Sequence, residues 1–426
     1  MNHVFERVWI FPFYLFSEVA YFMLNRYGEY IESFHYMTEE EKKDSLNNTA
    51  VIIPCHHALE EIKKNRENLQ NKFKYIFIAD NNNKNEVDYD LQAFCEENNL
   101  IYRYYNIPCK TNAILQTAYY IKDNFPFLDK IVLLDDDTVL GKDFFIRTDL
   151  LSESTCAGYT CTIGIQKTEK SNMIEEWIDF EYRTISYRNR SRNFHTLKFL
   201  HGIICVYNLS SLLRIYEWNT CNVGGLPFGE DAFSGIQARN CGYKLKQDHQ
   251  NIVYTFCPTK IFNFERRNTR VQGYGASSLF KQRVMRWYLS WPRRLLNEFG
   301  LLFFFDTGSW LGNVLYRFDF LWYLWILSVS SWWIGILVEM SLSVSNLKHF
   351  MILHALFYGM NIFTSSIRRC IMSEKERETI KWYTPITFPL FLLLLMFFYS
   401  CSFLLSVFYY IPFYRLDYKK CYQHVQ

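Results

Sequence analysis

Residues 130–145, KIVLLDDDTVLGKDFF, carry three adjacent carboxylates directly after a run of buried-type aliphatic residues. Adjacent like charges repel one another, and the end of a strand usually changes to Gly, Asn or Pro instead. The cluster Asp135, Asp136 and Asp137 therefore indicates a site that binds a cation. A solvated acidic turn is the alternative that this stretch alone leaves open.

Upstream of this stretch, short apolar runs alternate with helical patterns. The strand-like runs are 50–57, 74–83, 100–106 and 130–134, and the helical patterns are 58–70 and 109–125. Such alternation predicts βαβ units and a mostly parallel sheet. Because ligands bind beyond the carboxyl ends of the strands in these sheets, we expect Asp80 and the three acids at 135–137 to lie at one edge.

A nucleotide diphosphate with a divalent metal fits acids at such an edge. Mg²⁺ and Mn²⁺ take oxygen ligands and keep waters and phosphates as partners. If the segment is extended, alternate residues point the same way, so the carboxylates of Asp135 and Asp137 would both face one ligand. We therefore predict Mn²⁺ or Mg²⁺ as the cofactor.

A second acid motif lies in GGLPFGEDAFSG, residues 224–235, where Glu230 and Asp231 follow a Gly-rich approach. Glycines allow a carboxylate to be held at an exposed site. The alternative is a helix N-terminus that carries acids in its first turn, which is a common arrangement.

A third motif is KQRVMRWYLSWPRR, residues 281–294. Arginine and tryptophan side chains together suit phosphate binding and a surface on which a sugar stacks. The alternative is an amphipathic helix at the membrane surface whose arginines meet lipid phosphates.

Apolar residues are concentrated in the C-terminal part of the chain. Residues 320–338, FLWYLWILSVSSWWIGILV, have no charged side chain and are long enough to cross a bilayer core. Residues 349–367 form a second apolar segment. A third, 382–414, is too long for one untilted span, so one tilted helix or a broken pair both fit. The sequence therefore predicts an α-helical transmembrane region with several spans.

Two further segments predict contact with a membrane. Residues 8–24 are apolar apart from Glu18 and predict a membrane helix or an interfacial anchor. Residues 299–317 are interrupted by polar residues and predict an amphipathic helix in the interface. Basic residues are dense at 283–294 and again after residue 367, which by the positive-inside rule places the α/β domain in the cytosol. The predicted division begins with an N-terminal membrane helix or anchor at 1–30 and a cytosolic α/β domain at 45–298. An interfacial helix at 299–317, transmembrane helices at 318–414 and a tail at 415–426 follow.

Charge and cysteine content exclude two classes of protein. The net charge is +3 and no basic stripe is interleaved with aromatic residues, so we predict no nucleic-acid partner. The 12 cysteines are scattered and none forms a CxxC pair, which argues against a secreted disulfide framework.

In their order along the chain, these features resemble the membrane-integrated family 2 glycosyltransferases, among them hyaluronan, chitin and cellulose synthases. The shared order is an acid after the second strand, a DxD, a GED loop, an arginine–tryptophan motif and then membrane helices. Further stretches resemble the hyaluronan- and chitin-synthase-like branch: LLDDDT at 133–138, EEWIDFEYR at 175–183 and FLHGIICVYN at 199–208. The resemblance implies an α/β GT-A fold that binds a nucleotide sugar.

The resemblance also implies roles for the acids and for Lys110. Asp80 would contact the uracil or ribose of a UDP-sugar, and Lys110 would neighbour the nucleotide. Asp135 and Asp137 would hold the metal, Asp137 more directly, and Asp136 would lie beside the nucleotide. Asp231 would be the general base that deprotonates the acceptor hydroxyl, with Glu230 next to it.

The arginine–tryptophan motif would complete that site. Arg286 would hold the diphosphate and Trp287 would line the entry of the acceptor. The family has Gln three residues before this arginine, whereas here Arg283 stands in that position, within the predicted nucleotide site. An arginine there occurs in ceramide-glucosyltransferase-type relatives, which puts processive synthesis in doubt.

The predicted activity is inverting transfer from a UDP-sugar, giving a β-linked polysaccharide that moves through a channel of C-terminal helices. A first alternative is transfer of a single sugar to a membrane lipid, which needs the same acids but no channel. A second is a catalytically inactive membrane scaffold. The predicted partners are the UDP-sugar, a carbohydrate or lipid acceptor, and membrane lipids. The sequence does not indicate which sugar is transferred.

Overall fold

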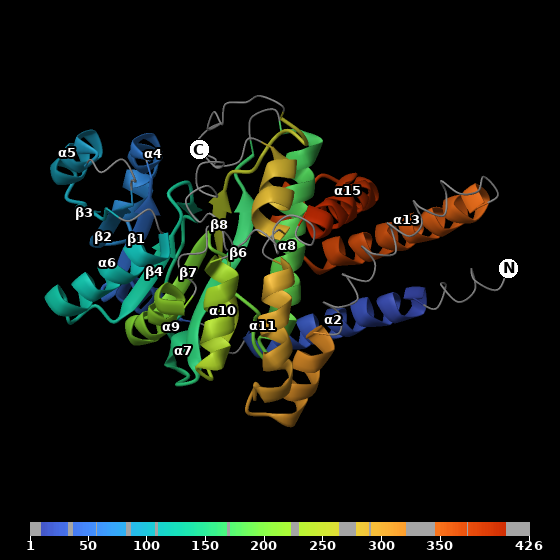
Figure 1. Cartoon of the computed structure of the whole chain (residues 1–426), viewed down its shortest axis with the longest axis horizontal. Coiled ribbons are helices and arrows are strands. Elements are labelled where there is room, and N and C mark those ends of the chain that lie inside the picture. Colours follow the sequence, from blue (N-terminus) through green and yellow to red (C-terminus); the bar gives the residue numbers. More distant parts are fainter. Residues whose placement is uncertain are drawn as a thin grey trace.

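The computed structural model describes residues 10–32, 37–56, 58–81, 87–106, 110–167, 171–222, 230–263, 278–288, 291–320, 346–372 and 374–405. Its centre is a sheet of eight strands in the order β3-β2-β1-β4-β7-β6-β8-β5 (Figure 1). The predicted span 320–338 lies almost wholly outside the described residues, and the predicted tail 415–426 lies wholly outside them.

The first half of the sheet is parallel. Its strands are β1 (Thr49–Cys55), β2 (Tyr75–Asp80), β3 (Ile101–Tyr104) and β4 (Lys130–Leu134). Strand β1 pairs in parallel with β2 and β4, and β2 pairs in parallel with β3. The four strands predicted from the sequence are therefore confirmed, with the helices α4 (Leu59–Gln70) and α6 (Lys110–Asn124) between them.

The second half of the sheet is mixed. Its strands are β5 (Val139–Leu140), β6 (Cys156–Ile165), β7 (Ile204–Asn208) and β8 (Lys244–Thr255). Strand β7 is antiparallel to both β4 and β6, β6 is parallel to β8, and β5 is antiparallel to β8. Only β7 and β5 therefore run against the other strands, and the predicted mostly parallel sheet is confirmed.

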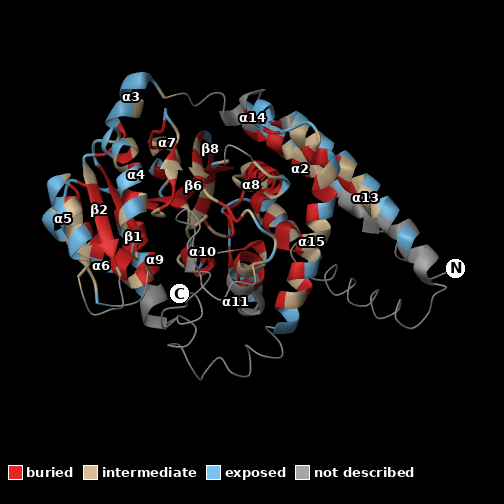
Figure 2. Cartoon of the chain, turned by 90° about the horizontal axis from the view of Figure 1, so that it is seen from above, coloured by how far each residue is buried: buried red, intermediate tan, exposed pale blue. Residues whose placement is uncertain are grey.

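Both faces of the central strands β1, β2 and β4 are buried, which explains why these strands are nearly continuous apolar runs. In β1, Val51 and Ile53 join a core under α4, α5 (Tyr89–Glu97) and α8 (Met173–Arg192). Ala50 and Ile52, which point to the opposite face, join a core under α6 and α9 (Leu209–Asn222). In Figure 2, the strands β1 and β2 are coloured mostly as buried.

Helix α8 connects the sheet to the C-terminal helices. It packs against β6 and β8, and it also contacts α2 (Ile10–Glu32) and α15 (Thr384–Leu405). The Trp177 ring stacks on Phe391 with centroids 5.5 Å apart, and its Nε1 donates to Thr387 Oγ1 at 3.0 Å. Because α8 is covered on both sides, its acids are paired: Asp179 accepts from Arg183 Nε at 3.0 Å.

The other helices differ in part from the predicted division of the chain. Helix α11 (Trp291–Phe304) crosses the predicted boundary between 298 and 299, and a separate helical stretch covers 310–320. The segment predicted as one interfacial helix at 299–317 is thus divided, because Gly308 takes a positive φ of 77° between the two helices. The remaining helices are α3 (Glu39–Asp44), α7 (Thr148–Ser152), α10 (Glu230–Asn240), α13 (Asn346–Ile371) and α14 (Glu374–Thr379).

Among the described residues, one helix has the length and hydropathy of a membrane span. It is α15, and 39% of its most apolar window is buried inside the protein. It is a single helix from 384 to 405 with Pro389 inside it, which favours one span over a broken pair in that stretch. Helices α2 and α13 lie side by side and extend away from the sheet (Figure 2). One such helix supports a membrane region only weakly, and several spans are not shown.

Candidate active site

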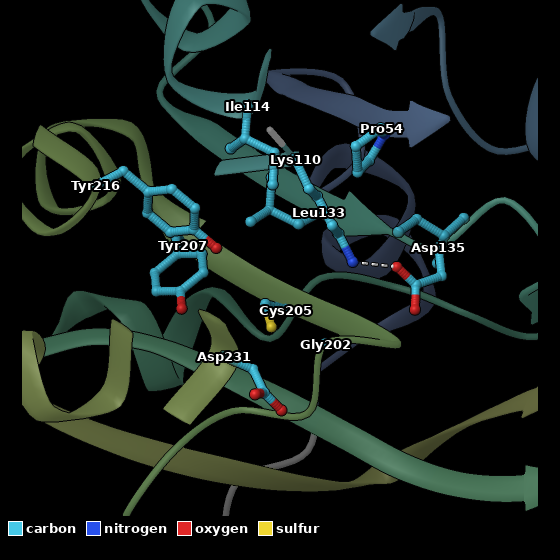
Figure 3. A pocket seen from close by; sticks show the side chains of 11 residues that line it. Pro54, Lys110, Ile114, Leu133, Asp135, Gly202, Cys205, Tyr207, Tyr216 and Asp231 are labelled. Atoms are coloured by element: carbon cyan, nitrogen blue, oxygen red, sulfur yellow. Dashed lines mark hydrogen bonds and ion pairs between the residues drawn. The ribbon is translucent and has the colours of Figure 1, made fainter. Parts of the chain in front are cut away.

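A narrow pocket lies where the carboxyl ends of β1 and β4 meet β7 and α10. Lys110, Asp135 and Asp231, three of the residues predicted from the sequence, lie together on its wall (Figure 3). Its remaining lining residues are Pro54, Ile114, Leu133, Leu134, Gly202, Cys205, Tyr207 and Tyr216. The enclosed space is about 10 Å³, which admits roughly one water molecule.

Lys110 and Asp135 form an ion pair across this pocket. Lys110 is the first residue of α6, and its Nζ donates to Asp135 Oδ1 at 2.6 Å. Both side chains are 31% exposed, so the pair can be reached by a ligand. A lysine held this way offers positive charge to an anionic group, and Asp135 fixes its position.

The acid cluster itself forms a turn. Thr138 N donates to Asp135 O at 3.1 Å, and Asn65 Nδ2 donates to the carbonyls of Asp136 and Thr138 at 3.1 and 3.3 Å. Asn68, three residues further along α4, bonds to Leu140 in both directions at 3.0 Å. The expectation that 135–137 is extended was therefore wrong, because α4 supplies amide groups that hold a turn.

As a result, Asp135 and Asp137 have different surroundings. Asp135 lines the pocket, whereas Asp137 is 8% exposed and its Oδ1 lies 3.5 Å from Thr255 Oγ1 of β8. Burial first, and then the charges of Asp136 and Asp135, raises the pKa of Asp137 well above its usual range. A buried carboxylate with two acidic neighbours would be stabilised by a cation, which is the alternative to protonation.

These carboxylates fit a divalent metal that also binds phosphate. The described residues contain no group of three His, Cys, Asp or Glu side chains placed to hold a metal by themselves. Mg²⁺ and Mn²⁺ are often held by only one or two carboxylates together with substrate phosphates and waters. Asp137 and Asp135 could supply those carboxylates, so the donor set suits a metal that arrives with a nucleotide.

Asp231 enters the pocket from the first turn of α10. The helix begins at Glu230, and Ala232 N donates to Asp231 Oδ1 at 2.8 Å. The acids thus stand at a helix N-terminus, as the alternative interpretation supposed, and Asp231 also lines the pocket. A Cβ on Gly202 would lie only 3.7 Å from the Cβ of Asp231. The side chain of Glu230 lies outside the described part of the chain.

Gly235 allows α10 to approach the segment that carries Gly202. A Cβ on Gly235 would lie 2.7 Å from the Cα of Phe199 and closer still to the Lys198 carbonyl oxygen. Arg239, one turn further, is buried and its Nη2 donates to the same carbonyl at 2.8 Å. This close contact fixes α10, and with it Asp231, against residues 198–202.

We expect Gly235→Ala to destabilise the protein by about 1–3 kcal/mol, because the added methyl group must displace backbone. Thermal unfolding of the two proteins measures the change. The matched control is Gly300→Ala in α11, where a Cβ would meet nothing within 4 Å and should be neutral or slightly stabilising. Equal unfolding temperatures for the two variants would contradict the predicted contact.

Burial also determines the protonation of groups beside the pocket. The pKa of His201 is lowered to about 4 by burial first and then by the charge of Arg192, so its ring is neutral near pH 7. The pKa of the Cys205 thiol is raised well above its usual range by burial first and then by Asp231. The described lining of the pocket has two carboxylates, Asp135, which is paired with Lys110, and Asp231, and a carboxylate suits accepting a proton from a neutral hydroxyl.

Asp80 lies at the same edge of the sheet but not in the pocket. It is fully buried at the end of β2, two strands from β4, and accepts a hydrogen bond from Tyr102 Oη at 2.6 Å. The predicted placement of Asp80 at the edge that carries the acid cluster is confirmed. Its contact with a nucleotide is a proposal.

The arginine–tryptophan motif forms a π-helix, η1 (Lys281–Tyr288), packed on α15. Arg283 is buried, pairs with Glu181 of α8 and stacks over the Trp287 ring at 4.1 Å. Arg283 therefore does not line the pocket, and it does not face a lipid surface either. Trp287 is half-buried, and the side chain of Arg286 lies outside the described residues.

Several pocket residues were not singled out from the sequence. Cys205, Tyr207 and Gly202 belong to FLHGIICVYN, a stretch noted only for its resemblance. Asn65 and Asn68, which hold the acid turn, looked like ordinary polar residues of a helix. Their spacing of three residues on α4 was the available signal, because it places both amides on one face.

No protein-family model and no curated protein matches the sequence. Among solved structures, a mannosyltransferase from Pyrobaculum calidifontis in complex with GDP-Man and Mn²⁺ is similar at a TM-score of 0.44 and 11% identity, covering 91% of this chain and 96% of that one. GalNAc-T7 with UDP, GalNAc and Mn²⁺ is similar at a TM-score of 0.37 and 12% identity, covering 60% of this chain and 50% of that one.

A third similar structure is glucosyl-3-phosphoglycerate synthase from Mycobacterium tuberculosis with phosphoglyceric acid, at a TM-score of 0.35 and 12% identity, covering 61% of this chain and 85% of that one. The first of these neighbours is described as a mannosyltransferase and the third as a synthase. At such low TM-scores the likeness does not assign a function, which has to follow from the side chains of this chain.

Proposed function

We propose that this chain is a glycosyltransferase of the GT-A type that takes its sugar from a nucleotide diphosphate, with UDP-sugars as the first candidates. The observation that carries the proposal is that Asp231 and the Lys110–Asp135 ion pair line one pocket at the carboxyl edge of the sheet. A proton acceptor and a positive charge are thereby placed where such sheets bind ligands.

Each charged group has a task in sugar transfer. Lys110 would stabilise the negative charge that develops on the leaving diphosphate, and Asp135 would hold Lys110 in place. Asp137 and Asp135 would hold Mn²⁺ or Mg²⁺, which when bound neutralises the same charge. Asp231 would take the proton of the acceptor hydroxyl as it attacks the anomeric carbon. Direct attack would invert an α-linked donor to a β-linked product.

The small size of the pocket limits what enters it. Its enclosed space of about 10 Å³ holds roughly one water molecule, so the sugar and the nucleotide would lie across its mouth, with the nucleotide toward Asp80. Asp80 and Tyr102 would then contact the base or ribose. Arg286 and Trp287 would complete the site from the side of the diphosphate and the acceptor.

For the acceptor, we propose a growing polysaccharide at a membrane, with the α/β domain in the cytosol. Helix α15 packs on α8 and η1 and brings an apolar helix next to the arginine–tryptophan motif. This arrangement suits a product that leaves along the C-terminal helices, in which further spans would take part. A single sugar passed to a membrane lipid is the alternative outcome of the experiment below.

A donor screen tests the proposed function. The full chain, purified in detergent with Mn²⁺ or Mg²⁺, would be assayed for UDP release from UDP-GlcNAc, UDP-glucose, UDP-glucuronate and UDP-galactose, alone and in pairs. A high-mass product from one donor would identify a homopolymer synthase, and a need for two donors a copolymer synthase. Release that requires added lipid would favour the lipid acceptor. No release under any of these conditions would contradict the proposal.

A further inference from the structure

A second cavity, far larger than the first, lies between α2, α8 and α13. Its volume is about 320 Å³, at the lower end of the range of about 300–1,000 Å³ that ligand pockets occupy. Its apolar wall includes Val19, Phe22, Met23 and Ile367. Among the residues that the structure describes, it shares no lining residue with the candidate active site.

Charged side chains from all three helices meet in the wall of this cavity. Glu18 of α2 is bridged by Arg188 of α8 and by Arg368 of α13, whose Nη2 donates to Glu18 Oε1 at 2.6 Å. The described part of the lining thus carries two guanidinium groups and one carboxylate. A guanidinium has five N–H donors, so it can contact a phosphate while it keeps a bond to a carboxylate.

Two polar residues of the wall have unsatisfied atoms. Asn25 is 3% exposed and its Oδ1 has no hydrogen-bond partner, and Thr184 is 6% exposed with no partner for Oγ1. Leaving a buried polar atom unpaired costs about 1–3 kcal/mol, so such atoms usually mark a missing partner. The amide oxygen needs a donor such as a hydroxyl, and the Thr184 hydroxyl can donate to an ester carbonyl.

The surface around the cavity is apolar. On α2, Val19 and Met23 line the cavity and are still 47% and 63% exposed, and Phe16 one turn earlier is 67% exposed. On α13, Phe363, next to the lining residue Thr364, is 54% exposed. Figure 2 shows the two helices side by side with exposed residues along their outer sides. A patch of this kind suits contact with lipid rather than with water.

We propose that this cavity binds an anionic glycerophospholipid that is not the substrate of the candidate active site. Part of one acyl chain would fill the space between α2 and α13, and the phosphate would contact Arg188 and Arg368. The head-group hydroxyls and the ester would satisfy Asn25 and Thr184. Because α8 also packs on β6 and β8, the bound lipid would tie α2 and α13 to the sheet.

Native mass spectrometry of the full chain in mild detergent tests this site, with phosphatidylglycerol as the probe and phosphatidylcholine of the same chains as the reference. We expect one retained phosphatidylglycerol per chain and about tenfold weaker retention of phosphatidylcholine, equivalent to about 1.4 kcal/mol. Val19→Trp and, independently, Met23→Trp should each lower the retention of phosphatidylglycerol about tenfold, because the indole fills the cavity. Both positions are partly exposed, so the larger side chain does not have to fit into a packed core.

Matched variants separate the cavity from the surface around it. Phe16→Trp on the exposed side of α2 should leave retention unchanged. Arg368→Gln should remove the preference for phosphatidylglycerol, whereas Arg377→Gln, an exposed arginine of α14 outside the cavity, should not. Equal retention by wild type, Val19→Trp and Met23→Trp would overturn the proposal, as would an equal preference for both lipids in the wild type. The assay does not depend on glycosyl transfer.

Discussion

Replacing Asp231 by Asn should lower the turnover number of glycosyl transfer by about 10²–10⁴-fold, the usual contribution of a positioned general base. An amide of the same shape keeps the hydrogen bond from Ala232 N to the side-chain oxygen, which measures 2.8 Å in the wild type. It cannot take the proton of an acceptor hydroxyl. The rate of UDP release, measured with the donor that the screen identifies, gives the size of the loss.

Measuring UDP binding by the variant distinguishes the loss of a general base from a loss of folding. Asp231→Asn should bind UDP with unchanged affinity, measured by calorimetry, because the nucleotide is assigned to Lys110 and the acid turn. Asp129→Asn is the matched control, since Asp129 is 65% exposed and pairs with Lys130 outside the pocket. A fully active Asp231→Asn enzyme would remove Asp231 from the mechanism, and lost UDP binding would reassign it to the nucleotide site.

The parallel half of the fold could be predicted from the sequence because it is determined by local patterns. Each predicted strand is a short apolar run that ends at a polar residue, and each is followed by a helical pattern. The carboxyl-edge rule then placed Asp80 and the acid turn at one side of the sheet without knowledge of the strand order. The second half of the sheet was not predicted, since β6 and β8 pair across about 90 residues with a shift in register.

The local shape of the site depended on contacts that no nearby sequence reveals. Residues 135–137 are a turn rather than an extended segment because of Asn65, which lies about 70 residues earlier in the chain. The motif predicts that Arg283 binds phosphate, whereas in the structure Arg283 pairs with Glu181 of α8 inside the core. Side chains of this kind can be assigned a charge from the sequence, but their partners are set by tertiary packing.

The prediction of membrane spans from hydropathy was limited in a similar way. The apolar residues of α15 were evident, but part of that helix is buried against α8 through Trp177 and Phe391. Composition alone does not separate an apolar run that packs against protein from one that would face lipid. The charged bridge between Glu18 and Arg368 could not be predicted, because it joins residues 350 positions apart.

Replacing Asp137 by Asn should have opposite effects on activity and on stability. The turnover number should fall about 10²–10³-fold, because the neutral amide would bind the metal poorly. A bound metal would stabilise the negative charge of the transition state by several kcal/mol. In the absence of metal, the variant should unfold at a temperature higher by about 2 °C or more. The reason is that Asp137 is buried beside Asp135 and Asp136, and the neutral amide removes the repulsion among them.

The change in thermal stability on adding metal tests whether Asp137 binds a cation. Wild type should gain thermal stability from Mn²⁺ with UDP, and Asp137→Asn should gain little. Asp143→Asn is the matched control, because Asp143 is exposed and lies six residues further along the same segment. It should keep both the activity and the stabilisation by metal. A variant at Asp137 that still responds to Mn²⁺ as the wild type does would show that this carboxylate is not a metal ligand, and that its burial serves the packing against Thr255 instead.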